Sequence, residues 1–215
     1  MTIRTALVAL SFAFLSTTAS AVELEPVFEA AALTQAVAVD HSASWEAYLR
    51  QQRQERVARL RAYRQAGVFP QDPTANGFFH SFLDANGTLC AVADLMWNSG
   101  SADLVQHTAA TRNDVVLSEV ADGPLVDWML TSGLTREEVA VIQVPSFDGG
   151  RAQGVRPIDP PQIALSPEDA EINRIRTHLQ AALMLLQADT ESSIAKAMSR
   201  LGERVNQAPP GMEGV

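Results

Sequence analysis

The sequence predicts a mainly α-helical protein with a short β-hairpin-like element; a small α+β fold is the alternative. Apolar residues recur at helical spacing over 45–66 and 166–206, and typical helix start and stop residues flank both stretches. Strand-like sequence is scarce, and residues 79–83 are the clearest short apolar run that precedes a turn signal. We therefore expect helices to dominate, with the β element near residues 79–90.

The N-terminal residues have the pattern of an export signal. Arg4 supplies the positive charge, and residues 6–15 form an apolar stretch that is too short to span a bilayer. Ala19-Ser20-Ala21 is a small-x-small cleavage site, so we expect residues 1–21 to be removed. The mature protein would begin at Val22 in the periplasm or the extracellular medium. We expect no membrane insertion after removal, because no later stretch approaches the roughly 18 apolar residues of a transmembrane helix.

The charge balance excludes some partners. The 215-residue chain has 16 cations and 25 acids, and loss of Arg4 with the leader lowers the net charge from −9 to −10. We expect no nucleic-acid partner, since an acidic surface disfavours binding to phosphates. Cys90 is the single cysteine, so no intrachain disulfide can form and stability must come from packing.

Composition shifts divide the chain into segments. The stretch over 148–165 is rich in proline and glycine and is the clearest boundary. The segments that we expect are a signal peptide over 1–21, an N-terminal arm over 22–40, a main helical domain over 41–147, a linker over 148–165, a helical hairpin over 166–206 and a disordered tail over 207–215.

Within the main domain, the first helix is expected from about Trp45 to Ala66, with Ser44 as N-cap and Gly67 as its stop. Six arginines lie on this helix, and they either meet acids elsewhere in the protein or form an anion or acidic-partner site; we favour the first interpretation. Further helices are expected at 90–98, 102–111, 124–130 and 135–143, the last with a T-x-x-E capping box.

The C-terminal hairpin carries an apolar stripe on each helix. Its two helices meet at a break near Asp189-Thr190, and Ser166 is the expected N-cap of the first helix. We expect the hairpin to dock on the main body or on another subunit. The stripe residues are Ile172, Ile175, Leu179, Leu183, Leu186, Ile194, Met198, Leu201 and Val205.

One segment, HSFLDANGTLC over 80–90, contains side chains suited to catalysis. Cys90 stands where a turn enters a helix, and helix N-terminal amides lower a thiol pKa and stabilise an oxyanion. His80 as the base and Asp84 as its orienting partner would complete a Cys-His-Asp acyl-transfer site. The structural interpretation, which we favour, is that Cys90 is a small buried apolar residue, His80 a half-buried strand residue and Asp84 a turn residue.

Other chemistry has weaker support in the sequence. A metal site from His80, Asp84, Cys90 and His107 would have suitable ligand types, but neither a CxxC nor an HxxxH pair is present. The sequence also lacks a GxSxG motif, a P-loop and a dinucleotide fingerprint. We therefore predict no cofactor and no metal, and the sequence indicates no particular small-molecule ligand.

Two segments carry a resemblance. The pattern F-x-D-x-x-G-x-x-C-A-x-x-x-L over 82–95, and S-G-L-T-x-E-E over 132–138 with Ile142-Gln143, resemble an uncharacterised group of exported bacterial proteins. The similarity covers about residues 45–147, and members of the group commonly have Gly where this chain has Ala93. The resemblance implies a bacterial, exported domain and no particular reaction.

Together these patterns indicate an exported, acidic, helical protein that acts as a non-enzymatic binding or structural module. Its interactions would be with a protein partner or with a second copy, through the 166–206 hairpin. The alternative is a cysteine-dependent hydrolase or acyl transferase that uses Cys90 with His80 and Asp84.

Overall fold

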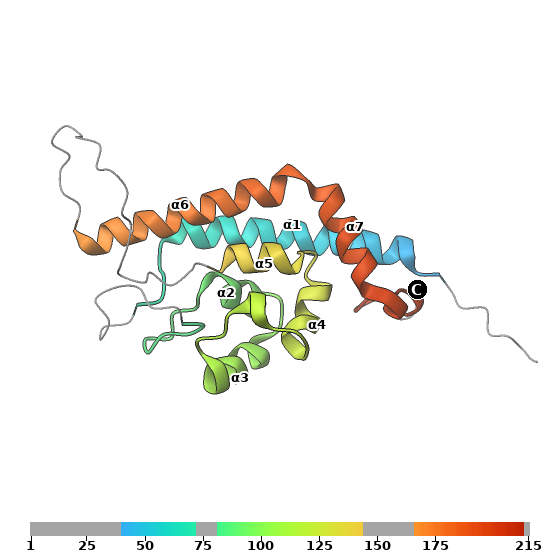
Figure 1. Cartoon of the computed structure of the whole chain (residues 1–215), viewed down its shortest axis with the longest axis horizontal. Coiled ribbons are helices and arrows are strands. Elements are labelled where there is room, and N and C mark those ends of the chain that lie inside the picture. The colour runs from blue at the N-terminus through green and yellow to red at the C-terminus, as the bar shows by residue number, and fades with distance from the viewer. Residues whose placement is uncertain (1–39, 72–80, 144–165, 213–215) are drawn as a thin grey trace, which may run out of the picture. The chain divides into compact units, whose positions relative to one another are not determined.

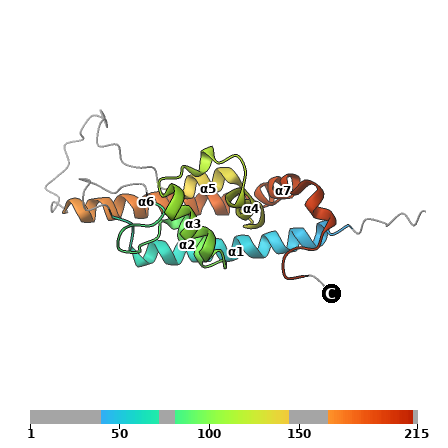
Figure 2. The same cartoon turned by 90° about the horizontal axis from the view of Figure 1, so that it is seen from below.

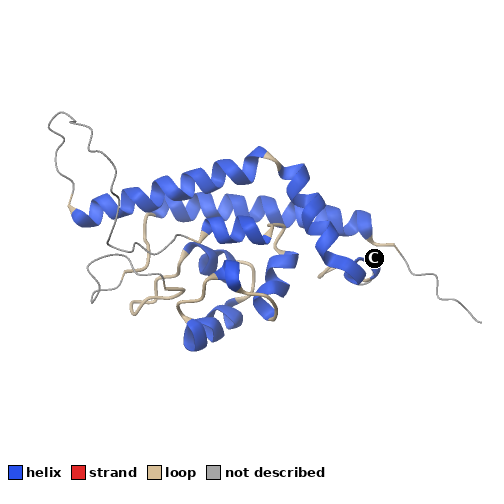
Figure 3. Cartoon of the chain, in the orientation of Figure 1, coloured by secondary structure: helices blue, strands red, loops and turns tan. Residues whose placement is uncertain are grey.

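The computed structural model describes residues 40–71, 81–143 and 166–212. The predicted signal peptide, nearly all of the N-terminal arm, the linker and His80 lie outside the described residues. The described part is helical, and it contains no β-strand (Figure 3). The mainly α prediction is therefore confirmed.

Helix α1, Ser42–Ala66, is the long central helix of the described part (Figure 1). It begins three residues before the predicted start, and its N-cap is His41, so the prediction of Ser44 as N-cap is wrong. The reason is local: the Asp40 carboxylate accepts hydrogen bonds from the Ser42 amide at 2.9 Å and from the Ser42 hydroxyl at 2.5 Å. The helix ends at Gly67 as predicted, with φ of 68°.

The helices predicted between residues 90 and 143 are present, and no end is shifted by more than one residue. Gly123 precedes the proline that opens α4, and Thr135 and Glu138 form the predicted capping box of α5. A short 3-10 turn, η1 over Leu117–Glu119, was not predicted. The elements are α2 over Ala91–Trp97, α3 over Ala102–Arg112, α4 over Pro124–Thr131 and α5 over Arg136–Ile142.

The predicted β-hairpin is wrong for the residues that the structure describes there. A single antiparallel bridge joins Leu83 to Leu89. The Asn113 side chain takes the place of a further strand, because its amide oxygen accepts from Leu83 N at 2.9 Å and its amide nitrogen donates to Leu83 O at 2.8 Å. The Asn113 carbonyl also accepts from Phe82 N at 2.7 Å. Asn113 thus supplies the hydrogen bonds that the backbone of Phe82 and Leu83 would otherwise form with a neighbouring β-strand.

The C-terminal helices are α6, Pro167–Ala188, and α7, Thr190–Leu201, followed by a 3-10 turn, η2, over Gly202–Asn206. Ser166 caps α6 as predicted, and Asp189 caps α7 at the predicted break. Helix α6 runs antiparallel to α1 and lies beside it in both views, while α2 packs on α1, α3 packs on α2 and α5 packs on α6 (Figures 1 and 2). The hairpin thus docks on the main body of its own chain.

Two apolar clusters form the core of the described part. The larger one joins α2, α4, α5 and α6 to the second half of α1, and it includes the α6 stripe from Ile175 to Leu186. The smaller one joins Trp45 and Leu49 to Ile194, Ala197 and Leu201 of α7. The stripe that we expected to mediate self-association is therefore largely buried within this chain. The large exposed apolar residues of α6 are Met184 and Leu185.

Residues 207–212 correct the prediction of a disordered tail. The Trp45 indole donates to the carbonyls of Arg204 at 3.1 Å and Gln207 at 2.8 Å, and Pro209 is buried. The His41 amide also donates to Val205 O at 3.2 Å. These contacts fasten the chain after α7 to the start of α1. In the described ranges, no helix is both long and apolar enough to cross a membrane.

Candidate functional site

Asp84 lies in the turn that joins the two sides of the Leu83–Leu89 bridge. Its carboxylate accepts three backbone amides: Gln71 at 3.0 Å, Asn86 at 2.8 Å and Thr88 at 2.7 Å. Burial alone would raise the pKa of Asp84, but these amide hydrogen bonds outweigh it and hold the pKa below its usual value. The carboxylate therefore organises the backbone of the turn, which is the structural role that the sequence suggested.

Cys90 is the N-cap of α2, as its predicted position required. Its Sγ accepts a hydrogen bond from Ala93 N at 3.4 Å, and the partly buried side chain packs against the larger apolar cluster. Burial raises the pKa of the thiol to about 11; amide hydrogen bonds, from Ala93 and Val92 among others, lower it but do not compensate. This shift is opposite to the one that a thiolate nucleophile requires.

The predicted base, His80, lies outside the described residues. The His80–Asp84–Cys90 site thus remains a prediction. The metal-site alternative depends on the same histidine. Within the part of the chain that is described, no group of three or more His, Cys, Asp or Glu side chains is arranged to hold a metal ion.

Of the six arginines of α1, Arg50, Arg53 and Arg59 contact acids of other elements, as the favoured interpretation expects. Arg59 makes a two-point contact with Asp94 of α2, at 2.7 and 2.5 Å. Arg50 contacts Glu191 of α7 through two nitrogens, each at 2.6 Å. Arg56 is more deeply buried, at 6% exposure, and burial lowers its pKa; its ion-pair partner, Glu55 at 3.8 Å, lies on the same helix.

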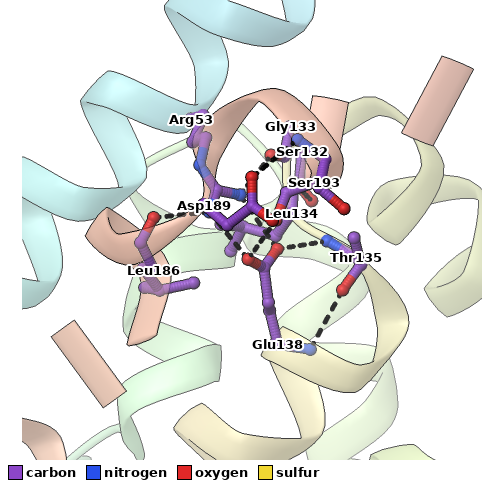
Figure 4. Close-up of polar contacts among 10 residues, drawn as sticks. Arg53, Ser132, Gly133, Leu134, Thr135, Glu138, Leu186, Asp189 and Ser193 are labelled. Carbon is purple, nitrogen blue, oxygen red and sulfur yellow. Dashed lines mark hydrogen bonds and ion pairs between the residues drawn. The ribbon is translucent and has the colours of Figure 1, made fainter. Parts of the chain in front are cut away.

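The most buried ion pair of the described part joins Arg53 to Glu138 of α5 (Figure 4). The two residues are 2% and 5% exposed, and the guanidinium reaches both carboxylate oxygens, at 2.7 and 2.9 Å. Arg53 also donates to the carbonyls of Gly133 at 3.1 Å and Leu186 at 2.6 Å. The Leu186 carbonyl is in the last turn of α6, where carbonyls have no partner within the helix.

Glu138 collects the remaining contacts of this pair. Its carboxylate accepts from the Thr135 amide at 2.8 Å and from the Ser193 hydroxyl of α7 at 2.7 Å. Burial alone would raise the pKa of Glu138, but these bonds and the Arg53 guanidinium outweigh it and lower the pKa. The network thus joins the start of α5, the end of α6 and the first turn of α7 to one side chain of α1.

Sequence reasoning identified Glu138 as a capping residue but missed Arg53 as its partner. The available signal was the position of Arg53 close to the apolar stripe of α1, between Leu49 and Leu60. Gln143 was missed as well: its amide donates to Val115 O and accepts from Leu117 N, each at 2.8 Å. No sequence pattern gives such long-range amide partners.

A groove of about 360 Å³ lies where α4, α5 and α7 meet. We call it the α4–α7 groove. Its apolar wall consists of Val126, Met129, Leu130, Leu134 and Ala197. Its charged rim consists of Arg136, Glu137 and Arg200, and Arg200 bonds to Glu137 at 2.7 Å. The sequence analysis did not identify this groove, since it depends on how α7 returns to the main body.

Comparisons with protein-family models, with curated proteins and with solved structures gave no match to this chain.

Proposed function

We propose that this chain is an exported, non-enzymatic binding or structural module, in which residues 81–90 have a structural role. Export is inferred from the N-terminal pattern of residues 1–21. The main support for a non-enzymatic role is the protonation state of the Cys90 thiol. Its thiol caps α2, and burial raises its pKa to about 11, so nearly all of it is protonated at neutral pH.

The surroundings of Asp84 support the same proposal. Three backbone amides already occupy its carboxylate, and a triad orienter needs an oxygen that is directed at the imidazole of the base. The other residues of the 82–95 pattern have folding roles as well: Phe82 and Leu95 are buried, and Gly87 has a φ of 83°. The segment thus has a structural explanation that does not involve catalysis.

Self-association through the hairpin is the less favoured form of this proposal. The α6 stripe is buried, and the exposed apolar side chains that a second copy could use are Met184 and Leu185, at 63% and 49% exposure. Exposed apolar residues of this number are ordinary on a monomer. We therefore propose ligand or partner binding at another surface.

The test of the proposal is the reactivity of Cys90 in the full mature chain. We expect iodoacetamide to label the native thiol with an apparent pKa near 11, against the ordinary value of 9 for an exposed thiol. At pH 8 this difference makes native labelling roughly a hundredfold slower than labelling of the denatured chain, because the thiolate is the reactive form. His80→Ala should leave the native rate unchanged.

The opposite result would support the cysteine-dependent hydrolase or acyl transferase. Fast native labelling at pH 7, slowed by His80→Ala, would overturn the non-enzymatic proposal. Turnover of an activated ester that is lost in Cys90→Ser would do the same. Asp84→Asn would then separate an orienting role, which affects the rate, from a turn role, which affects stability.

A further inference from the structure

The α4–α7 groove has the size and lining of a small-molecule site. Ligand sites in proteins span about 300–1,000 Å³, with mostly apolar walls and a few polar groups, and this groove of about 360 Å³ falls in that range. If one water-sized group takes about 30 Å³, the groove has room for roughly a dozen non-hydrogen atoms.

The groove is preformed, because its wall belongs to the two apolar clusters. Met129 and Leu134 are buried members of the larger cluster, and Ala197 is a buried member of the smaller one. The space therefore lies at the seam between two packed regions. Side chains that are fixed by packing on their far side cannot easily move to fill it. Val126 and Leu130, which are half-buried, complete the wall.

The charges at the rim favour an anionic ligand. Arg200 and Glu137 neutralise each other across α5 and α7, and the Arg200 hydrogen bond lowers the pKa of Glu137 to about 2, so this pair persists at neutral pH. Arg136 remains as the excess positive charge. In the described ranges no carboxylate lies within ion-pair distance of it, and its Nη2 donates to the Ser118 carbonyl at 2.8 Å. A guanidinium has five N–H donors, so Arg136 can also bind a carboxylate.

We propose that the α4–α7 groove binds a small anionic amphiphile, an aliphatic carboxylate of about ten non-hydrogen atoms. The chain would lie against Val126, Leu130 and Leu134, and the carboxylate would bind Arg136. This inference rests on the proposed binding role of the protein. It adds a site and a ligand class to that role.

The experiment is a calorimetric titration of the full mature chain with octanoate. We expect saturable binding at one site per chain. Arg136→Gln should weaken octanoate binding by about ten- to a hundredfold, the usual effect of a hydrogen bond between charged groups. The same variant should leave the affinity for octanol unchanged, since octanol has the chain without the charge. The matched control is Arg61→Gln, which removes an exposed arginine outside the groove and should change neither affinity.

A second variant tests the apolar wall. Val126→Trp fills the groove from a half-buried position, and it should abolish binding of both octanoate and octanol while circular dichroism shows an unchanged fold. Absence of octanoate binding to the folded wild-type chain, or equal affinities in wild type and Arg136→Gln, would overturn the inference.

The two proposals fail in different ways. If octanoate does not bind but Cys90 labels slowly, the groove inference is wrong and the non-enzymatic module stands. If p-nitrophenyl octanoate is hydrolysed and Cys90→Ser abolishes this turnover, the non-enzymatic proposal is wrong, whatever the titration shows.

Discussion

Arg53 and Glu138 lie 85 positions apart in the sequence and meet as a buried, two-point ion pair at 2.7 and 2.9 Å. The pair stands where the start of α5, the end of α6 and the first turn of α7 reach α1. Both ions are almost fully removed from water, so each depends on the other for its charge compensation. We therefore expect this pair to control how the C-terminal hairpin is held on the main body.

Arg53→Met should destabilise the fold by about 3–5 kcal/mol, because it leaves the Glu138 carboxylate buried without its cation. The double variant Arg53→Met, Glu138→Gln should recover much of that loss. It has no uncompensated charge, and glutamine keeps the capping box with Thr135. Urea unfolding of the variants measures these free energies of unfolding.

The control for that cycle is the exposed ion pair between Arg204 and Asp127. Arg204→Gln should cost at most about 1 kcal/mol, because water and salt screen such pairs. Equal unfolding free energies for Arg53→Met and Arg204→Gln would show that burial of the Arg53 pair has no special effect.

For Arg56, on the same helix, we expect substitution to have the opposite effect on stability. It is 6% exposed, and among the described residues its Nε is buried without a hydrogen-bond partner. Its Nη2 donates to the neutral Gln52 amide oxygen at 2.5 Å, and the carboxylate in ion-pair contact, Glu55, is 3.8 Å away and half-exposed. Arg56→Met should therefore be neutral or stabilising, since it removes a poorly compensated buried charge and leaves no buried anion behind. Thermal unfolding, compared with Arg53→Met, checks this contrast. A loss as large as that of Arg53→Met would contradict it.

Acid should weaken the Arg53–Glu138 network. The folded-state pKa of Glu138 lies below its ordinary value of 4.5, so the carboxylate contributes stability fully above that value. As the pH falls from about 4.5 through the folded pKa, the unfolded chain takes up the proton first and this stability is lost. Unfolding free energies measured between pH 3 and 7 should fall more steeply for wild type than for Arg53→Met, Glu138→Gln. Parallel curves would exclude Glu138 as a source of the slope.

The helices of this fold could be predicted because their signals are local. Each helix boundary signal lies within one or two turns of the boundary that it marks. These signals are Gly67 at the end of α1, Pro124 at the start of α4 and the Thr135 capping box at the start of α5. The β element could not be predicted correctly, because Asn113 satisfies the backbone of Leu83 from 30 positions away. The β-strand propensity of residues 79–83 does not indicate that Asn113 is their hydrogen-bond partner.

The candidate site shows the same limit. Sequence placed Cys90 correctly at the start of a helix, but the pKa of its thiol depends on burial by segments distant in sequence. The α4–α7 groove could not be predicted at all, since its wall combines residues of α4 with Ala197 of α7. Such contacts depend on how the hairpin docks on the main body, where Arg53 contacts the end of α6 and Glu138 contacts the first turn of α7.

Gly133 provides the sharpest test of the packing between the α4–α5 turn and α1. Its φ is 74°, and a Cβ at this position would overlap the Leu49 carbonyl oxygen and lie 2.6 Å from the Arg53 amide nitrogen. Gly133→Ala should therefore force the turn away from α1 and weaken the hydrogen bond from Arg53 to the Gly133 carbonyl. Gly100→Ala is the matched control, since Gly100 has a φ of 84° and open space around its missing Cβ.

Gly100→Ala should lower the free energy of unfolding by about 1–2 kcal/mol, because alanine is strained in the left-handed backbone conformation. Gly133→Ala should cost clearly more, because the clash with backbone atoms of α1 adds to the same strain. Urea unfolding of the two variants isolates the packing contribution as their difference. Equal losses would mean that the turn can move off α1 without cost, and the role of Arg53 in fastening it would then be wrong.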